Sequence, residues 1–170
     1  MLSFDIRSLE SQAAHVDGEL TPDDPVWEED DVRPVKPILV HGRLSAAGPD
    51  RFYFSGRING ETEISCRRCL KEVSVPVDEE AHFIFSSEGE DAEDDPDVFA
   101  FEPMAHSLDL RPAVRETWLL AVPGYVLCRE DCKGLCPNCG TDWNNGTCEC
   151  VPVTTESRWD ALRAIRDQLP

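Results

Sequence analysis

Eight cysteines carry the clearest chemistry in this sequence, because their spacing is that of metal ligands. A Cys-x-x-Cys turn presents two sulfurs at the separation that zinc requires, with four thiolates at about 2.3 Å arranged as a tetrahedron. Eight thiolates divide into two such sites, so we expect two structural zinc ions, and at least one. The predicted ligands are Cys66, Cys69, Cys128, Cys132, Cys136, Cys139, Cys148 and Cys150.

The most specific piece of this pattern is Cys136-Pro-Asn-Cys139-Gly140. Proline fixes φ after the first ligand, and glycine accepts a positive φ after the second, so that backbone N–H groups can turn toward the sulfurs. Cys148 and Cys150 follow across a turn predicted at residues 144–146. These four cysteines are predicted to form a self-contained site.

The other four cysteines are Cys66, Cys69, Cys128 and Cys132. A site built from them would join two segments that lie far apart in the chain. Spacing alone leaves a second grouping open, in which Cys128 or Cys132 joins the Cys136 and Cys139 pair and the last two cysteines are spare. If a single metal binds, the unused thiols are buried or free.

Four thiolates leave zinc no open coordination position, which favours a scaffold over a catalyst. The sequence has no His-Glu-x-x-His, phosphate-binding loop or Gly-x-Ser-x-Gly motif, and His15, His41, His82 and His106 stand singly. Two alternatives use the cysteines differently: thiol redox chemistry at the first pair, which lacks the usual βαβ setting, and an iron–sulfur cluster, for which the turns are less typical.

The net charge of −18, from 34 acidic and 16 basic residues, argues against non-specific nucleic-acid binding, which requires a basic surface. A basic protein partner fits this charge better. Arg67, Arg68 and Lys71 are expected to offset thiolate charge at the first pair. The acidic runs at residues 17–31 and 88–97 are expected to be solvated loops.

The N-terminal residues lack an apolar run of signal-peptide length, and no later segment is long and apolar enough to span a membrane. We therefore expect a cytoplasmic protein. Thiols are kept reduced in that compartment, which favours metal binding over disulfides.

Apolar periodicity predicts an α+β fold, with an antiparallel β-rich body, two amphipathic helices and zinc-knuckle elements. Alternation at Leu2, Phe4 and Ile6 predicts an opening strand, and a Pro-rich acidic excursion at residues 17–37 follows, held to the body by Trp27. The strands are expected at residues 38–44, 51–58, 61–65, 73–77 and 81–85, with turns at residues 47–50 and at Asn59-Gly60. The first cysteine pair then lies at a hairpin tip.

A helix is predicted around residues 109–122, with Asp109 as its cap, Pro112 in its first turn and Pro123-Gly124 at its end. Its arginines and Glu116 are expected to be solvated. A second stripe, Trp159, Leu162, Ile165 and Leu169, predicts a C-terminal helix. The expected organisation is a body at residues 1–127, a cysteine-rich knuckle at 128–152 and a terminal helix at 153–170, integrated as one domain that is large enough to fold without metal.

The motif order resembles that of the YceD family, proteins named for accumulation of the large ribosomal RNA subunit. The residues that carry the resemblance are Ile64-Ser-Cys66-Arg-Arg-Cys69-Leu70, the helix 108–118, Cys132-Lys-Gly-Leu-Cys136-Pro-Asn-Cys139-Gly, Cys148-x-Cys150 and the helix 158–169. The resemblance implies a large-subunit assembly or RNA-maturation factor, with no established catalytic residues to carry over. Some members lack the later cysteines and keep the first pair, which implies two separable sites and places Cys66 and Cys69 with Cys128 and Cys132.

These observations favour a non-enzymatic, zinc-stabilised protein that assists large-subunit biogenesis by binding a ribosomal precursor, through a basic ribosomal protein rather than naked RNA. Two alternatives remain at this point. One is an enzyme of thiol-redox or RNA-processing type, and the other is a zinc-ribbon adaptor for transcription.

Overall fold

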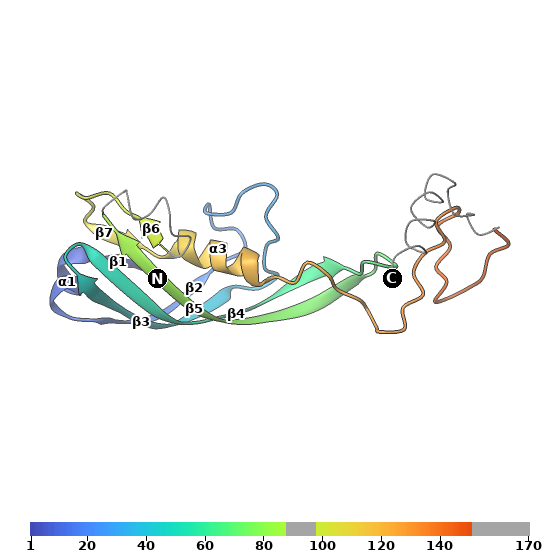
Figure 1. The fold of residues 1–170 in the computed structure, drawn as a ribbon, viewed down its shortest axis with the longest axis horizontal. Helices are drawn as coiled ribbons and strands as arrows, with labels where there is room; N and C mark the ends of the chain where they lie inside the picture. The colour runs from blue at the N-terminus through green and yellow to red at the C-terminus, as the bar shows by residue number, and fades with distance from the viewer. Residues whose placement is uncertain (88–97, 151–170) are drawn as a thin grey trace, which may run out of the picture.

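The computed structural model describes residues 1–87 and 98–150. A five-stranded mixed sheet forms its centre, in the order β2-β3-β4-β5-β6 (Figure 1). Neighbouring strands are antiparallel except β5 and β6, which pair in parallel. The strands are β2 (Ala14–Leu20), β3 (Ile38–Gly48), β4 (Arg51–Ser65), β5 (Glu72–Ser86) and β6 (Val98–Ala100).

A small two-stranded sheet and two helices complete the described part of the chain. β1 (Ser3–Asp5) pairs antiparallel with β7 (Ser107–Asp109), and the helices are α1 (Ile6–Ser11) and α3 (Arg111–Ala121). The described residues are therefore mostly β, as predicted. The predicted C-terminal helix and the acidic run at residues 88–97 lie outside the described residues.

The core lies between the sheet and α3, which runs along one face of the sheet in Figure 1. Alternate residues of β3 and β4, such as Val40, Leu44, Phe54 and Ile58, are fully buried, which gives each strand one inward face. Among the described residues no helix covers the opposite face, which is mostly polar, as is common in antiparallel sheets. Trp118 is the largest fully buried side chain of α3.

The predicted hairpin turn at Asn59-Gly60 is wrong. β4 continues through both residues to Ser65, and Gly60 pairs with Val77 of β5. A Cβ atom at Gly60 would lie 2.5 Å from Cζ3 of Trp118, so this glycine provides space for the indole ring rather than a turn. The chain reverses instead at residues 66–71, which places the first cysteine pair at a hairpin tip as expected.

The N-terminal prediction needs two corrections. The opening strand is only three residues long and leads at once into α1, whose first turn is capped by the Asp5 carboxylate accepting from the Ser8 backbone N–H at 2.9 Å. The acidic excursion begins at residue 21 rather than 17, because β2 extends to Leu20. Trp27 holds the excursion to the body, as predicted, because its ring is buried in the core. Its Nε1 donates to the carbonyl of Thr21, at the start of the excursion, at 2.8 Å.

The sequence predicted solvated arginines on α3, but in the structure both form ion pairs. Arg115 donates two hydrogen bonds to the Asp31 carboxylate, at 2.6 and 2.8 Å, and Arg111 pairs with Asp109 and Asp24. These contacts fasten the acidic excursion to the helix. Asp109 accepts from the Arg111 backbone N–H at 3.0 Å, while Leu110 occupies the cap position itself.

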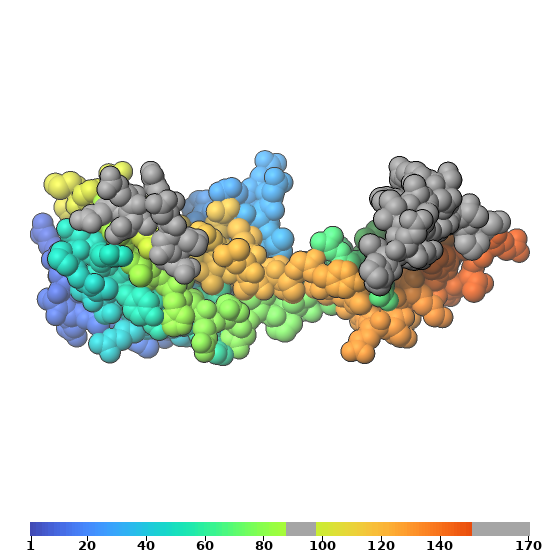
Figure 2. All heavy atoms as spheres, in the orientation of Figure 1, coloured from blue at the N-terminus to red at the C-terminus, as the bar shows by residue number. Residues whose placement is uncertain are grey.

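β4 and β5 extend beyond the rest of the sheet as a two-stranded ribbon. β3 has its last partner on β4 at Asn59, whereas β4 and β5 remain paired as far as Ser65 and Glu72. We call residues 62–65 and 72–75 the distal ribbon. Figures 1 and 2 show that it leads away from the body toward residues 128–150. Among the described residues, no helix has the length and apolar character needed to cross a membrane.

Candidate metal centre

Two groups of four cysteines lie at the end of the distal ribbon, and in each group the four sulfur atoms all lie within 4.8 Å of one another. We call them the first cysteine group (Cys66, Cys69, Cys128 and Cys132) and the second cysteine group (Cys136, Cys139, Cys148 and Cys150). The structure places all eight cysteines singled out from the sequence in these two groups. Cys128 and Cys132 lie with Cys66 and Cys69, and not with Cys136 and Cys139.

The first cysteine group joins the hairpin tip to the segment after α3. The Cys66 and Cys132 sulfurs are 3.8 Å apart and the Cys69 and Cys128 sulfurs 3.6 Å apart, close to the separation in a zinc tetrathiolate and far beyond the covalent distance of about 2.05 Å. All eight cysteines are free thiols. The donor set and its spacing therefore fit a soft divalent ion such as zinc.

The two Cys-x-x-Cys turns have the same backbone design. In the first, the Cys66 N–H donates to the Lys71 carbonyl at 2.8 Å and the Leu70 N–H to the Cys66 carbonyl at 2.9 Å. In the second, the Cys136 N–H donates to the Thr141 carbonyl and the Gly140 N–H to the Cys136 carbonyl, each at 2.9 Å.

The residue after the second cysteine has a positive φ in both turns, 60° at Leu70 and 73° at Gly140. A positive φ at Gly140 was predicted from the sequence. Leu70 adopts this conformation without being glycine, which is unfavourable for a branched side chain.

Burial differs between the groups. Cys66 and Cys132 are buried and the other two members of the first group are partly so, whereas Cys139 and Cys150 of the second group are exposed. The second cysteine group is therefore the more accessible to solvent.

Within each cysteine group, some thiols have a lowered pKa and others a raised one. Burial opposes ionisation of Cys66, but backbone N–H groups lower its pKa to about 6, and the Thr141 hydroxyl lowers the pKa of Cys139 to about 6. Burial and the neighbouring Cys69 sulfur raise the pKa of Cys128 to about 12, and the Cys139 sulfur raises that of Cys150 to about 12. Four thiolates this close need a cation among them, because like charges oppose one another's ionisation.

Three polar side chains that the sequence did not single out interact with these sulfurs. The Asn144 amide nitrogen donates to the Cys132 sulfur at 3.5 Å, the Trp143 Nε1 donates to the Cys148 sulfur at 3.4 Å, and the Thr141 hydroxyl lies 3.1 Å from the Cys139 sulfur. Only the turn at residues 144–146 was foreseen. The contacts of these three side chains depend on which sulfurs lie nearby in the folded chain. The spacing of the cysteines in the sequence does not reveal that.

The basic residues near the first pair bind backbone carbonyls rather than sulfurs. Arg67 donates twice to the Gly124 carbonyl, at 2.8 and 3.0 Å, and Arg68 donates to the Cys132 carbonyl at 2.8 Å. The expected neutralisation of thiolate charge by Arg67, Arg68 and Lys71 stays a prediction, and these contacts add a mechanical role. They tie the hairpin tip to the segment after α3.

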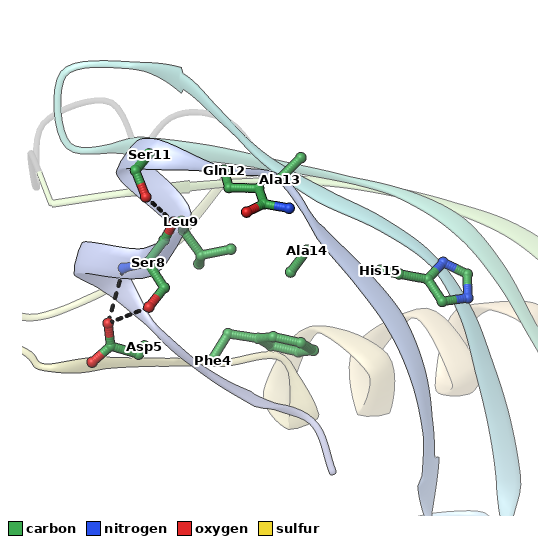
Figure 3. A pocket seen from close by; sticks show the side chains of 9 residues that line it. All are labelled: Phe4, Asp5, Ser8, Leu9, Ser11, Gln12, Ala13, Ala14 and His15. Carbon is green, nitrogen blue, oxygen red and sulfur yellow. Dashed lines mark hydrogen bonds between the residues drawn. The ribbon is translucent and has the colours of Figure 1, made fainter.

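A separate hollow of 430 Å³ lies beside α1, at the opposite end of the molecule. Its polar groups serve the local fold: Asp5 accepts from the Ser8 backbone and hydroxyl, and the Ser11 hydroxyl donates to the Ser8 carbonyl (Figure 3). His15 lies at the far end of this hollow from Asp5, so the two do not form an acid–base pair.

A family model described as large ribosomal RNA subunit accumulation protein YceD matches residues 54–166. The chain belongs to the YceD family. The matched region begins in β4 and contains β5, α3 and both cysteine groups, whereas β1 to β3 precede it. The family is named for accumulation of an RNA rather than for a reaction.

Two curated relatives match parts of the chain. An uncharacterized protein, YlbN of Bacillus subtilis (strain 168), is 32% identical over 114 residues, which cover 66% of this chain and 64% of YlbN. The chloroplastic large ribosomal RNA subunit accumulation protein YCED homolog 1 of Arabidopsis thaliana is 26% identical over 73 residues, or 43% of this chain and 23% of the relative. The chain thus spans less than two thirds of either relative. No solved structure matches.

Proposed function

We propose that this chain is a non-enzymatic, zinc-stabilised binding protein that supports accumulation of large-subunit ribosomal RNA. The observation that carries the proposal is the pair of closed four-sulfur groups in a chain of the YceD family. A tetrathiolate site leaves zinc no open position for water or substrate. All eight cysteines are proposed as metal ligands, four to each of two zinc ions.

Zinc at the first cysteine group would fix the direction of the distal ribbon. Among the described residues, the tip and the segment after α3 otherwise meet through hydrogen bonds, such as Arg67 N–H to the Val126 carbonyl at 2.9 Å and those of the Arg67 and Arg68 side chains. We propose that residues 1–127 form the body, residues 128–152 the knuckle and residues 153–170 a terminal helix, all within one integrated domain. The metal ions then hold the knuckle in place on a body that folds without them.

The proposed partner is a ribosomal precursor, bound through a basic ribosomal protein. The net charge of −18 attracts a lysine- and arginine-rich protein and repels phosphate. Acidic side chains are also spread along the helix-free face of the sheet, where strand register places them on the side opposite the core. They are Asp17, Glu19, Glu61, Glu63, Glu72, Asp78 and Glu80.

Sedimentation of the tagged, metal-loaded protein in an extract tests this function. We expect the protein to sediment with large-subunit precursors, and binding to a purified basic ribosomal protein to weaken strongly between about 0.1 M and about 1 M salt, because screening shortens the range of the attraction. Equal affinity for naked ribosomal RNA would contradict the proposed partner. Copurification with RNA polymerase in place of precursors would favour the transcription adaptor.

A further inference from the structure

The loop between Cys139 and Cys148 belongs to the second cysteine group by sequence, yet it also reaches the first. Its tight turn is held by the Asp142 carbonyl, which accepts from the backbone N–H groups of Asn145 and Gly146 at 3.1 and 3.0 Å. The Trp143 N–H donates to the Gly134 carbonyl at 3.0 Å, which fixes the turn against the link between the two groups.

Two consecutive residues of this turn face opposite ways. Trp143 donates to the Cys148 sulfur of the second cysteine group, and Asn144 donates to the Cys132 sulfur of the first. A single rigid turn therefore supplies one N–H donor to a sulfur of each group. Hydrogen bonds to ligand atoms orient those ligands and stabilise their charge when the metal is bound.

The surroundings of Asn144 fix which end of its amide faces the sulfur. Its oxygen accepts from the Lys133 backbone N–H and from the Arg129 guanidinium, each at 2.8 Å. Both of these partners can only donate, so the amide nitrogen must point toward Cys132 and Asp142. Asn144 thus contacts Arg129, Cys132 and Lys133, in the segment that carries the first cysteine group. Its own position is set by the loop of the second cysteine group.

We propose that the turn at residues 142–145 couples the two metal sites, with Asn144 as the positioning residue, so that metal at the second cysteine group strengthens metal binding at the first. The proposal rests on the proposed function, because it requires both groups to bind zinc. Metal at Cys139 and Cys148 closes the loop and adds to the hydrogen bonds that hold Asn144 in place, whereas a loop without that metal is held by those hydrogen bonds alone. The accessible site then controls the buried one.

The test compares Asn144→Asp with Asn145→Asp in the full-length zinc-loaded protein. Asn144→Asp keeps the oxygen that accepts from Lys133 and Arg129 but replaces the donor that faces Cys132. Asn145→Asp makes the same change of charge beside Asp142, to which Asn145 also donates at 2.6 Å. In the described part of the chain, Asn145 has no hydrogen bond to a sulfur. The readout is alkylation of each cysteine, mapped by mass spectrometry, as chelator is added.

We expect Asn144→Asp to expose the first cysteine group to alkylation at chelator concentrations about tenfold lower than in the unaltered protein, the usual lower bound for loss of such a contact. Asn145→Asp should leave that group protected. Equal protection of the first group in the Asn144→Asp variant and its control would overturn the proposal. Two zinc ions in the unaltered protein would show that the proposed function survives that failure.

A second variant, Cys148→Ser with Cys150→Ser, tests the coupling with Asn144 intact. Loss of metal from the second cysteine group should again expose the first group at lower chelator concentrations. An unchanged first group in this variant would show that the two sites are independent.

Discussion

Gly60 is the residue at which local sequence preference and tertiary packing disagree most clearly. Asn-Gly usually marks a two-residue hairpin, but here Gly60 lies in mid-strand beneath the ring of Trp118. The space left by its missing side chain allows the helix to approach the sheet.

Substitution Gly60→Ala should therefore lower the free energy of unfolding by about 1–3 kcal/mol, as expected for overpacking a core. The Trp118 ring or the whole of α3 must move to admit the new methyl group. Thermal or denaturant unfolding measures the change. Gly124→Ala is the control, since a Cβ there meets nothing within 4 Å, and an equal effect of both changes would contradict the packing argument.

The Arg115–Asp31 pair is a second interaction that the sequence did not predict. The Asp31 side chain is only 9% exposed and that of Arg115 20%. Hydrogen bonds from Arg115 hold the pKa of Asp31 below its ordinary value.

Removing Arg115, as Arg115→Met, should cost about 1–3 kcal/mol of stability, because the Asp31 carboxylate loses its partner. A double-mutant cycle with Asp31→Asn should give a favourable coupling energy. The depressed pKa means that this coupling is complete above the unfolded-state pKa of about 3.9 and is lost only as the pH falls through the lower folded-state value. It should thus be the same at pH values of about 6 and about 8.

The exposed Arg57–Asp78 pair serves as the comparison, with side chains 51% and 54% exposed. Its coupling should be smaller, between about 0 and 1 kcal/mol. A coupling for Arg115 and Asp31 no larger than this would show that burial adds nothing to the pair.

At the scale of elements, the β4–β5 ribbon determines where the cysteines meet. Removing zinc with a chelator should speed amide hydrogen exchange at Cys66 and Leu70, whose hydrogen bonds close the first knuckle turn. It should also speed exchange at Arg67 and Leu135, whose hydrogen bonds join the hairpin tip to the segment after α3. Amides in the centre of β3 and β4 should keep their protection, since the core does not depend on metal. Unfolding of these central strands together with the knuckle would contradict this division.

The sequence predicted elements well where one local pattern decides them. The inward alternation of β3 and β4, the helix that contains Val114 and Trp118, and the two knuckle turns all follow from local spacing. The sequence could not reveal that β4 passes through Asn59, since that depends on a ring more than fifty positions away in the chain. The contacts of Asn144 and Arg115 were hidden for the same reason, because their partners come from other segments.

At the scale of the whole molecule, charge is the property most relevant to the proposed partner. Glu63 and Glu72 lie on the helix-free face of the distal ribbon, near the cysteine groups. The double change Glu63→Lys with Glu72→Lys should weaken binding to a basic ribosomal protein at least about tenfold at low salt, mainly by slowing association. Surface plasmon resonance measures both rates.

Glu10→Lys with Glu102→Lys is the matched control, because it alters net charge equally at two exposed positions of the body. An equal loss of affinity in both variants would show that only the total charge matters. No loss in the ribbon variant would exclude this face as the binding surface.

Metal content of the natively purified protein, measured together with thiol alkylation, tests the central claim most directly. We predict about two zinc ions per chain and eight cysteines that resist alkylation until a chelator is added. A metal-free protein that is fully folded, with the distal ribbon ordered and its thiols reactive, would contradict the account.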